Sequence, residues 1–130
     1  IDLEVTSGRG PGTVTVSVEG CCGDFAIFQM HENLIEGEVE EEVVAAQLTA
    51  EEAVTTGRDE LLKSILRRRS QDEKPVIAQT LDVGMFYYPF WVYYFRRGAR
   101  HIDIRLLDAL TAERGGNRTK MGLLNALAKK

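Results

Sequence analysis

The side chains of this 130-residue sequence that could attack a substrate or hold a metal ion are two cysteines and two histidines. Cys21 and Cys22 are adjacent, a spacing at which a structural disulfide between them is geometrically disfavoured. The sequence has no C-x-x-C or H-x-x-x-H pattern, and nothing in it brings a cysteine to His31 or His101. We therefore expect no metal ion, no cofactor and no catalytic residues, and the sequence favours a protein that is not an enzyme.

Two alternating patterns could also gather ionisable groups on one face of a strand. The first is a possible ionic trio: His101, Asp103 and Arg105. The second, which could approach a cation, is a run of alternating glutamates: Glu38, Glu40 and Glu42. Solvated strand faces and charged edges, which deter aggregation, explain both patterns. The glycine-rich stretch 8–12 lacks the lysine of a phosphate loop, so none of these patterns indicates an active site.

Charge is distributed unevenly along the chain. Residues 1–57 carry a net charge of −11 and residues 58–130 a net charge of +7, which leaves −4 overall. We expect the two halves to neutralise each other in part. A basic face could attract an anionic partner, but the acidic half weakens any attraction to nucleic acid, which is therefore not a favoured partner.

The aromatic residues are concentrated in one segment, because eight of the ten lie between Phe86 and Phe95. In a strand, one face would carry the following side chains: Phe86, Tyr88, Phe90, Val92 and Tyr94. The opposite face would carry the alternating set: Met85, Tyr87, Pro89, Trp91, Tyr93 and Phe95. Both faces are apolar, so we expect a central strand that is covered on both sides, with a bulge, edge position or bend at Pro89.

Two interpretations of this aromatic strand stay open: core alone, or core on one face and a binding surface on the other. Tyrosine and tryptophan are enriched at the energetic centres of protein interfaces, and every buried tyrosine hydroxyl needs a hydrogen-bond partner. The candidate binding residues are the aromatic side chains and the arginines that flank them: Tyr87, Tyr88, Trp91, Tyr93, Phe95, Arg96, Arg97, Arg100 and Arg105.

The longest apolar run, from Val83 to Phe95, is too short to cross a membrane as a helix, which needs about 20 residues. The first residues have neither the basic start nor the apolar run of a signal peptide. Because no disulfide between the two cysteines is expected, the sequence favours a reducing compartment. We therefore expect a soluble, cytoplasmic protein, with a processed exported protein as the alternative.

Sequence patterns place these residues on strands and helices, and no internal repeat is visible. Alternation of apolar and polar residues predicts strands at 1–6, 13–19, 25–30, 76–81 and 101–107. Thr49 and Glu52 form a capping box that begins a helix at 50–69, and an apolar stripe predicts a second, short helix at 118–130. A glycine turn follows the aromatic strand, so this strand and 101–107 are expected to form a hairpin.

Three stretches follow one another in the C-terminal half: YPFWVYY from Tyr88 to Tyr94, the triplet 102–104 (IDI), and DALTAE from Asp108 to Glu113. Together they resemble the hairpin of PepSY-like domains, in which the second strand ends in an Asp-Ala-x-Thr-Gly-Glu turn. Ala112 stands where that pattern has glycine, and the likeness covers residues 49–114. The resemblance implies a helix on an antiparallel sheet, in a small non-enzymatic module associated with inhibition or protein–protein contacts.

These observations predict a single α+β domain with an antiparallel sheet of five or six strands, one main helix packed on it and a short C-terminal helix. Its parts would be an N-terminal hairpin region at 1–48, the helix and aromatic hairpin at 49–114, and the helix at 118–130. The favoured function is a non-catalytic protein-binding or assembly module that acts through the aromatic strand, with a protein partner or a second copy in a homodimer. The alternative is a pocket protein or small enzyme that holds a small apolar ligand or lipid between helix 50–69 and the aromatic strand.

Overall fold

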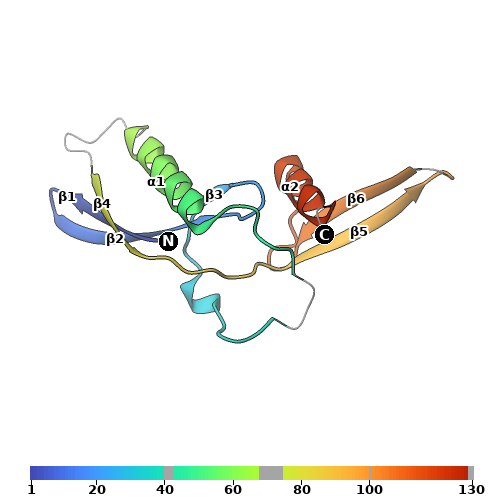
Figure 1. Cartoon of the computed structure of the whole chain (residues 1–130), viewed down its shortest axis with the longest axis horizontal. Helices are drawn as coiled ribbons and strands as arrows, with labels where there is room; N and C mark the ends of the chain where they lie inside the picture. Colours follow the sequence, from blue (N-terminus) through green and yellow to red (C-terminus); the bar gives the residue numbers. More distant parts are fainter. Residues whose placement is uncertain (40–42, 68–74, 100, 129–130) are drawn as a thin grey trace.

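The computed structural model describes residues 1–39, 43–67, 75–99 and 101–128 (Figure 1). Its elements are, in chain order, β1 (Asp2–Ser7), β2 (Gly10–Val18), β3 (Phe25–Ile27), η1 (His31–Asn33), α1 (Ala50–Leu66), β4 (Val76–Asp82), β5 (Phe90–Arg97), β6 (His101–Asp108) and α2 (Asn117–Ala128). The α+β class predicted from the sequence is confirmed. The strands fall into two antiparallel sheets, however, whereas the sequence patterns predict one.

The larger sheet has four strands in the order β3-β2-β1-β4, and every neighbouring pair is antiparallel. Its core is a cluster of buried apolar side chains from β1, β2 and α1: Leu3, Val16, Leu61 and Ile65. The strand predicted at 25–30 is shorter than expected, because pairing with β2 ends at Ile27 and η1 follows.

Helix α1 begins where the capping box predicts. The Thr49 hydroxyl accepts a hydrogen bond from the amide of Glu52 (3.1 Å), whose carboxylate accepts one from the amide of Thr49 (2.8 Å). Gly57 lets the helix lie close to the sheet, since a Cβ there would stand 3.2 Å from side-chain atoms of Ile1 and Val16. The helix ends at Leu66, and the last two residues of the predicted helix, 68 and 69, lie outside the described residues.

The smaller sheet is the hairpin of β5 and β6, called the aromatic hairpin below (residues 90–108). Its register runs without a break from Phe90 opposite Asp108 to Arg97 opposite His101, and the turn contains Gly98 at φ +74°. Within the described residues β5 pairs with β6 alone, so the prediction of a central strand is wrong. Figure 1 shows this hairpin extending away from the four-stranded sheet.

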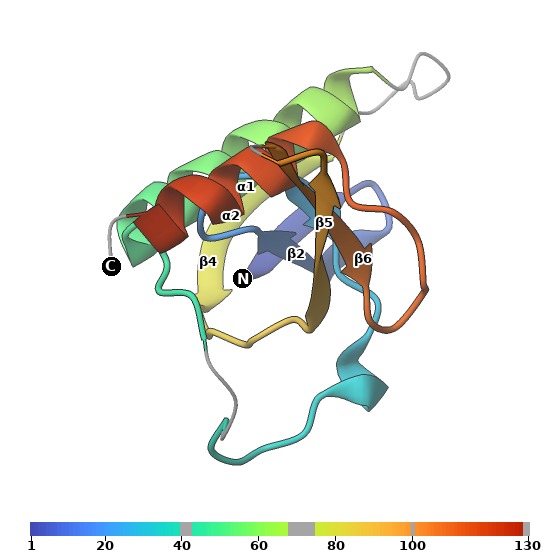
Figure 2. The same ribbon diagram turned by 90° about the vertical axis from the view of Figure 1, so that its right-hand side faces the viewer.

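Helix α2 links the two parts of the molecule. A Cβ at Gly122 would lie 2.9 Å from the Cβ of Cys22, so α2 rests closely on the turn that follows β2. Its Lys120 ammonium is 3.7 Å from the Asp103 carboxylate on β6. Figure 2 and Figure 1 agree that α1 and α2 lie on the same side of the strands. No helix in the described part of the chain is long and apolar enough to span a membrane.

Candidate binding surface on the aromatic hairpin

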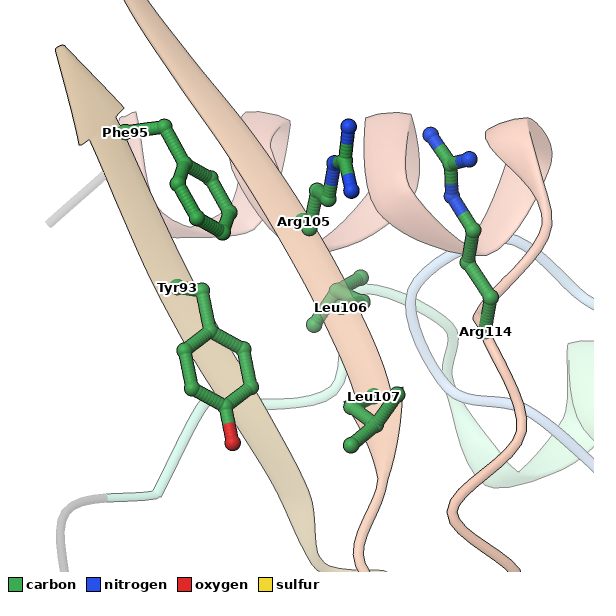
Figure 3. A pocket seen from close by; sticks show the side chains of 6 residues that line it. All are labelled: Tyr93, Phe95, Arg105, Leu106, Leu107 and Arg114. Carbon is green, nitrogen blue, oxygen red and sulfur yellow. The ribbon is translucent and has the colours of Figure 1, made fainter.

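One face of the aromatic hairpin carries Trp91, Tyr93 and Phe95, because alternate residues of a strand share a face. The register adds three residues from β6 that lie opposite these aromatic residues: Leu107, Arg105 and Asp103. We call these six residues the outer face. Figure 3 views this face, with a helix behind the strands. Leu106 has the opposite orientation and is only 2% exposed, so the other face of the hairpin is covered at Leu106, although Tyr94 on that face is 67% exposed.

The aromatic side chains of the outer face are in contact with solvent: Trp91 is 61% exposed, Tyr93 45% and Phe95 43%. The Tyr93 and Phe95 rings are stacked at 28°, with their centroids 6.4 Å apart. Together they leave a flat apolar surface of the kind that forms the centre of protein interfaces.

A shallow groove crosses this face and has a volume of about 240 Å³. Its lining, shown in Figure 3, comes from β5, β6 and the chain after β6: Tyr93, Phe95, Arg105, Leu106, Leu107 and Arg114. The guanidinium carbon of Arg105 lies 5.1 Å from the centroid of the Phe95 ring, which is cation–π geometry. The groove therefore combines apolar rings with positive charge. None of its lining residues comes from α1, which packs on the larger sheet.

The flanking arginines of the sequence prediction do not gather at one place. Arg105 lies in the groove, whereas Arg96 is exposed opposite Ile102, on the other face of the hairpin. Arg97 lies in β5, but its side chain is not among those described, and Arg100 is outside the described residues. Sequence reasoning missed Arg114, which the turn after β6 returns to a bridge with Leu107.

Two of the predicted tyrosines lie before β5. Tyr87 is 48% exposed in the segment that joins the two sheets. Its neighbour Phe86 contacts Phe28 with ring centroids 5.1 Å apart, so this segment is packed against the chain after β3. The Tyr88 hydroxyl donates a 2.7 Å hydrogen bond to the Asp108 carboxylate, and Tyr88 therefore ties the start of β5 to the end of β6.

The bond between Tyr88 and Asp108 shifts the pKa of both groups. Burial, followed by the hydrogen bond to the Asp108 carboxylate, raises the pKa of Tyr88 to about 12. Burial acts to raise the pKa of Asp108, but hydrogen bonds from Tyr88 and from the amides of Leu110 and Thr111 outweigh it and lower that pKa. Asp108 is thus a charged acceptor that organises the turn, and its geometry gives it a structural role.

The turn after β6 closes through its backbone. The amide of Asp108 donates to the carbonyl of Glu113 and the amide of Ala112 to the carbonyl of Asp108, both at 2.8 Å. The Asp108 carboxylate accepts from the amides of Leu110 (2.8 Å) and Thr111 (3.0 Å). Ala112 has φ +60°, a conformation that favours glycine.

The turn after β2 has the same hydrogen bonds as the turn after β6, although no internal repeat is visible in the sequence. The amide of Glu19 donates to the carbonyl of Asp24 and the amide of Gly23 to the carbonyl of Glu19, both at 2.8 Å. The Glu19 carboxylate accepts from the amides of Cys21 (3.0 Å) and Cys22 (2.7 Å), and Gly23 has φ +79°. Both hairpins of the molecule therefore end in the same carboxylate-capped turn.

The cysteines of this first turn are held as thiols. The Cys22 thiol donates to the Glu19 carboxylate at 2.7 Å. Burial and this hydrogen bond raise the pKa of Cys22 to about 12, and burial followed by the charge of Glu19 raises the pKa of Cys21. Because the thiolate is the nucleophile, neither residue is prepared for attack. In the described part of the chain, no group of three His, Cys, Asp or Glu side chains could hold a metal ion.

The remaining charged candidates are dispersed. Asp103 pairs with Lys120 while Arg105 lies over Phe95, and the side chain of His101 is not described. Glu38 is exposed, and Glu40 and Glu42 lie outside the described residues. Among the described residues, the ion pairs of Lys63 with Glu60 and of Lys120 with Asp103 both lie within the basic half, residues 58–130.

Comparison with protein-family models, curated proteins and solved structures gave no match. The resemblance to PepSY-like domains therefore stays a prediction.

Proposed function

We propose that this chain is a non-catalytic protein-binding or assembly module that acts through the aromatic hairpin. The observation that carries the proposal is the outer face, where three aromatic side chains stand side by side at 43–61% exposure. Side chains of this type bury large areas with little loss of conformational freedom, which is why they dominate interface energetics. The partner is a protein chain, either another protein or a second copy.

The groove adds a charge preference to this surface. Arg105 is anchored over Phe95, and Arg114 enters from the chain after β6. A partner that places an apolar side chain on the rings and a carboxylate beside these arginines would gain from both contacts. Within the described residues Cys21 and Cys22 form no disulfide, which supports a reducing compartment such as the cytoplasm.

A small-molecule site is the second candidate, and the groove is the observation in its favour. Its volume of about 240 Å³ is small beside the roughly 300–1,000 Å³ of ordinary ligand pockets, and it is open to solvent. Such a site would bind a small apolar or aromatic anion without any reaction. The flat aromatic surface around the groove favours a protein partner over this alternative.

The proposal is tested by two substitutions on the outer face, Trp91→Ala and Tyr93→Ala. We expect each to weaken self-association at least about tenfold, measured by sedimentation at increasing concentration, because each removes exposed aromatic area. Each should change the free energy of unfolding by less than about 1 kcal/mol, because exposed side chains contribute little to the core. Leu66→Ala is the matched control, since Leu66 is 55% exposed on α1 in the other part of the molecule.

The proposal is wrong if the two variants lose stability in urea titration while association is unchanged. It is equally wrong if Leu66→Ala weakens association as much as Trp91→Ala does. The small-molecule candidate would gain if an aromatic carboxylate probe bound the wild type and not Arg105→Ala.

A further inference from the structure

One edge of the aromatic hairpin is open. The amide of Ala109 donates to the carbonyl of Pro89 (3.1 Å). Because hydrogen-bonded and non-hydrogen-bonded pairs alternate along an antiparallel ladder, the odd-numbered residues of β5 are the ones that exchange hydrogen bonds with β6. The amides and carbonyls of the even-numbered residues therefore point away from β6, and they belong to Phe90, Val92, Tyr94 and Arg96. In the described part of the chain no other strand pairs with them.

The base of the opposite edge of the hairpin is closed by the chain itself. The amide of Gly115 donates to the carbonyl of Leu106 (3.0 Å), and Arg114 forms a bridge with Leu107. The base of β6 is therefore paired on both sides, whereas β5 has no second partner strand among the described residues.

In the β1–β2 hairpin, the edge that corresponds to the open edge of β5 is paired with another strand. Because both hairpins end in the same turn, β1 corresponds to β5 and β2 to β6. One edge of β1 pairs with β2, and the other edge pairs antiparallel with β4, for example Val5 with Ile77. The edge that β4 fills on β1 is the edge that is open on β5.

Edge strands of soluble proteins are usually protected by charge, proline or short length. From Phe90 to Phe95, β5 has none of these features. A two-stranded hairpin is also marginal in water, and three or more strands are needed for a sheet that is stable by itself. Edge strand β4 differs, because the Arg58 guanidinium donates to the carbonyl of Ala78 (3.1 Å).

We propose that two copies of the chain associate by antiparallel pairing of their β5 strands, which makes one four-stranded sheet in the order β6-β5-β5-β6. This inference rests on the proposed function and names its partner, a second copy, and its mode of contact. A two-fold axis makes such an edge complementary to itself, since each outward amide meets an outward carbonyl.

The sequence of β5 selects the antiparallel orientation and its register. With Val92 opposite Tyr94 of the second copy, Tyr93 lies at the axis beside its own counterpart and Trp91 faces Phe95 of the second copy. Aromatic cross-strand pairs of this kind stabilise sheets. The two Arg96 side chains then lie at opposite ends, about 20 Å apart, whereas parallel pairing would place these positive charges side by side.

The edge is tested with Tyr94→Pro and its matched control Tyr94→Ala. Tyr94 is 67% exposed and its amide points away from β6, so proline blocks the outer edge and leaves the ladder to β6 intact. We expect the dimer dissociation constant from sedimentation to be at least about tenfold higher for Tyr94→Pro than for Tyr94→Ala. Equal dissociation constants for the two variants, or a wild type that stays monomeric at about 1 mM, would overturn the proposal.

The register is tested by cross-linking in a chain with Cys21→Ala and Cys22→Ala. Tyr93→Cys should form a disulfide-linked dimer under mild oxidation, because a non-hydrogen-bonded pair on the axis brings the two Cβ atoms to about 4.5–5.5 Å. Leu107→Cys lies on the same face but two strands farther from its counterpart, and it should cross-link at least about tenfold more slowly. Equal rates would contradict the register.

A third variant, Trp91→Ala, separates failure of this inference from failure of the proposed function. If Trp91→Ala dissociates the dimer while Tyr94→Pro behaves as Tyr94→Ala, the aromatic face is an interface and edge pairing is wrong. If Tyr94→Pro alone dissociates it, edge pairing stands and the aromatic face is not the binding surface.

Discussion

The two hairpins of this protein are followed by the same kind of turn, yet they differ in how much of each is covered. The β1–β2 hairpin has α1 on one face, β4 along one edge and β3 along the other, and it contributes Leu3 and Val16 to the core. The aromatic hairpin is richer in large apolar side chains, yet much of that surface is exposed. Apolar content alone therefore does not decide what is buried, because a strand is covered only if the chain supplies an element to cover it.

The largest expected difference between the hairpins is in their contribution to stability. Leu3 is fully buried, so Leu3→Ala should lower the free energy of unfolding by about 2–5 kcal/mol in urea titration. Trp91→Ala, in the aromatic hairpin at 61% exposure, should change it by less than about 1 kcal/mol. Similar losses for the two variants would show that the larger sheet is not the stable part of the molecule.

Substitutions at equivalent positions of the two turns should change the free energy of unfolding in opposite directions. Gly23→Ala places a side chain at φ +79° and should destabilise the protein by about 1 kcal/mol, with Leu48 at an ordinary 3.7 Å from the new Cβ. Ala112→Gly relieves φ +60° at the equivalent position, so it should cost nothing or stabilise by up to about 1 kcal/mol. Thermal unfolding of the two variants measures both effects. The equivalence of the turns fails if the signs agree.

The smallest expected effect is a dependence on alkaline pH that each turn contributes separately. The pKa of Cys22 in the folded protein is raised from 9.0 to about 12 and that of Tyr88 from 10.0 to about 12. In the unfolded chain Cys22 ionises near pH 9.0 and Tyr88 near pH 10.0. The stability that each group contributes is therefore fully present below its unfolded pKa and is lost as the pH rises to about 12. Unfolding midpoints across this range should fall less steeply in Cys22→Ala above pH 9 and in Tyr88→Phe above pH 10. If the unfolding midpoints of both variants fall with pH as steeply as those of the wild type, the raised pKa values of Cys22 and Tyr88 are wrong.

Local signals in the sequence predicted most of the elements. The capping box at Thr49 and the alternation at 13–19 and 101–107 reflect hydrogen bonds and burial between near neighbours, so they were visible without the fold. The division into two sheets depends on which distant strands meet. Alternation shows that both faces of β5 are apolar, but it carries no information on whether an element is present to cover them.

The candidate surface was predicted in part, for the same reason. Trp91, Tyr93 and Phe95 share a face by strand periodicity, and Arg105 joins them through the hairpin register. Tyr88 was expected to be a binding residue, and its hydrogen bond to Asp108 could not be predicted because it spans 20 positions. Arg114 is brought back by the turn after β6, and the repeated turn itself is hidden because EGCCGD and DALTAE share only acidic first and sixth residues and small second and fifth residues.

The close approach of Gly122 to Cys22 has a consequence for the direction in which the aromatic hairpin points. Helix α2 contacts the turn after β2 through Gly122 and contacts β6 through Lys120, so it connects the two hairpins. The hairpin is a lever about 27 Å long, and a rotation of a few degrees at its base moves its tip by ångströms. A methyl group at position 122 would push α2 away from Cys22, and a shift of α2 that carried β6 with it would move the tip of the aromatic hairpin.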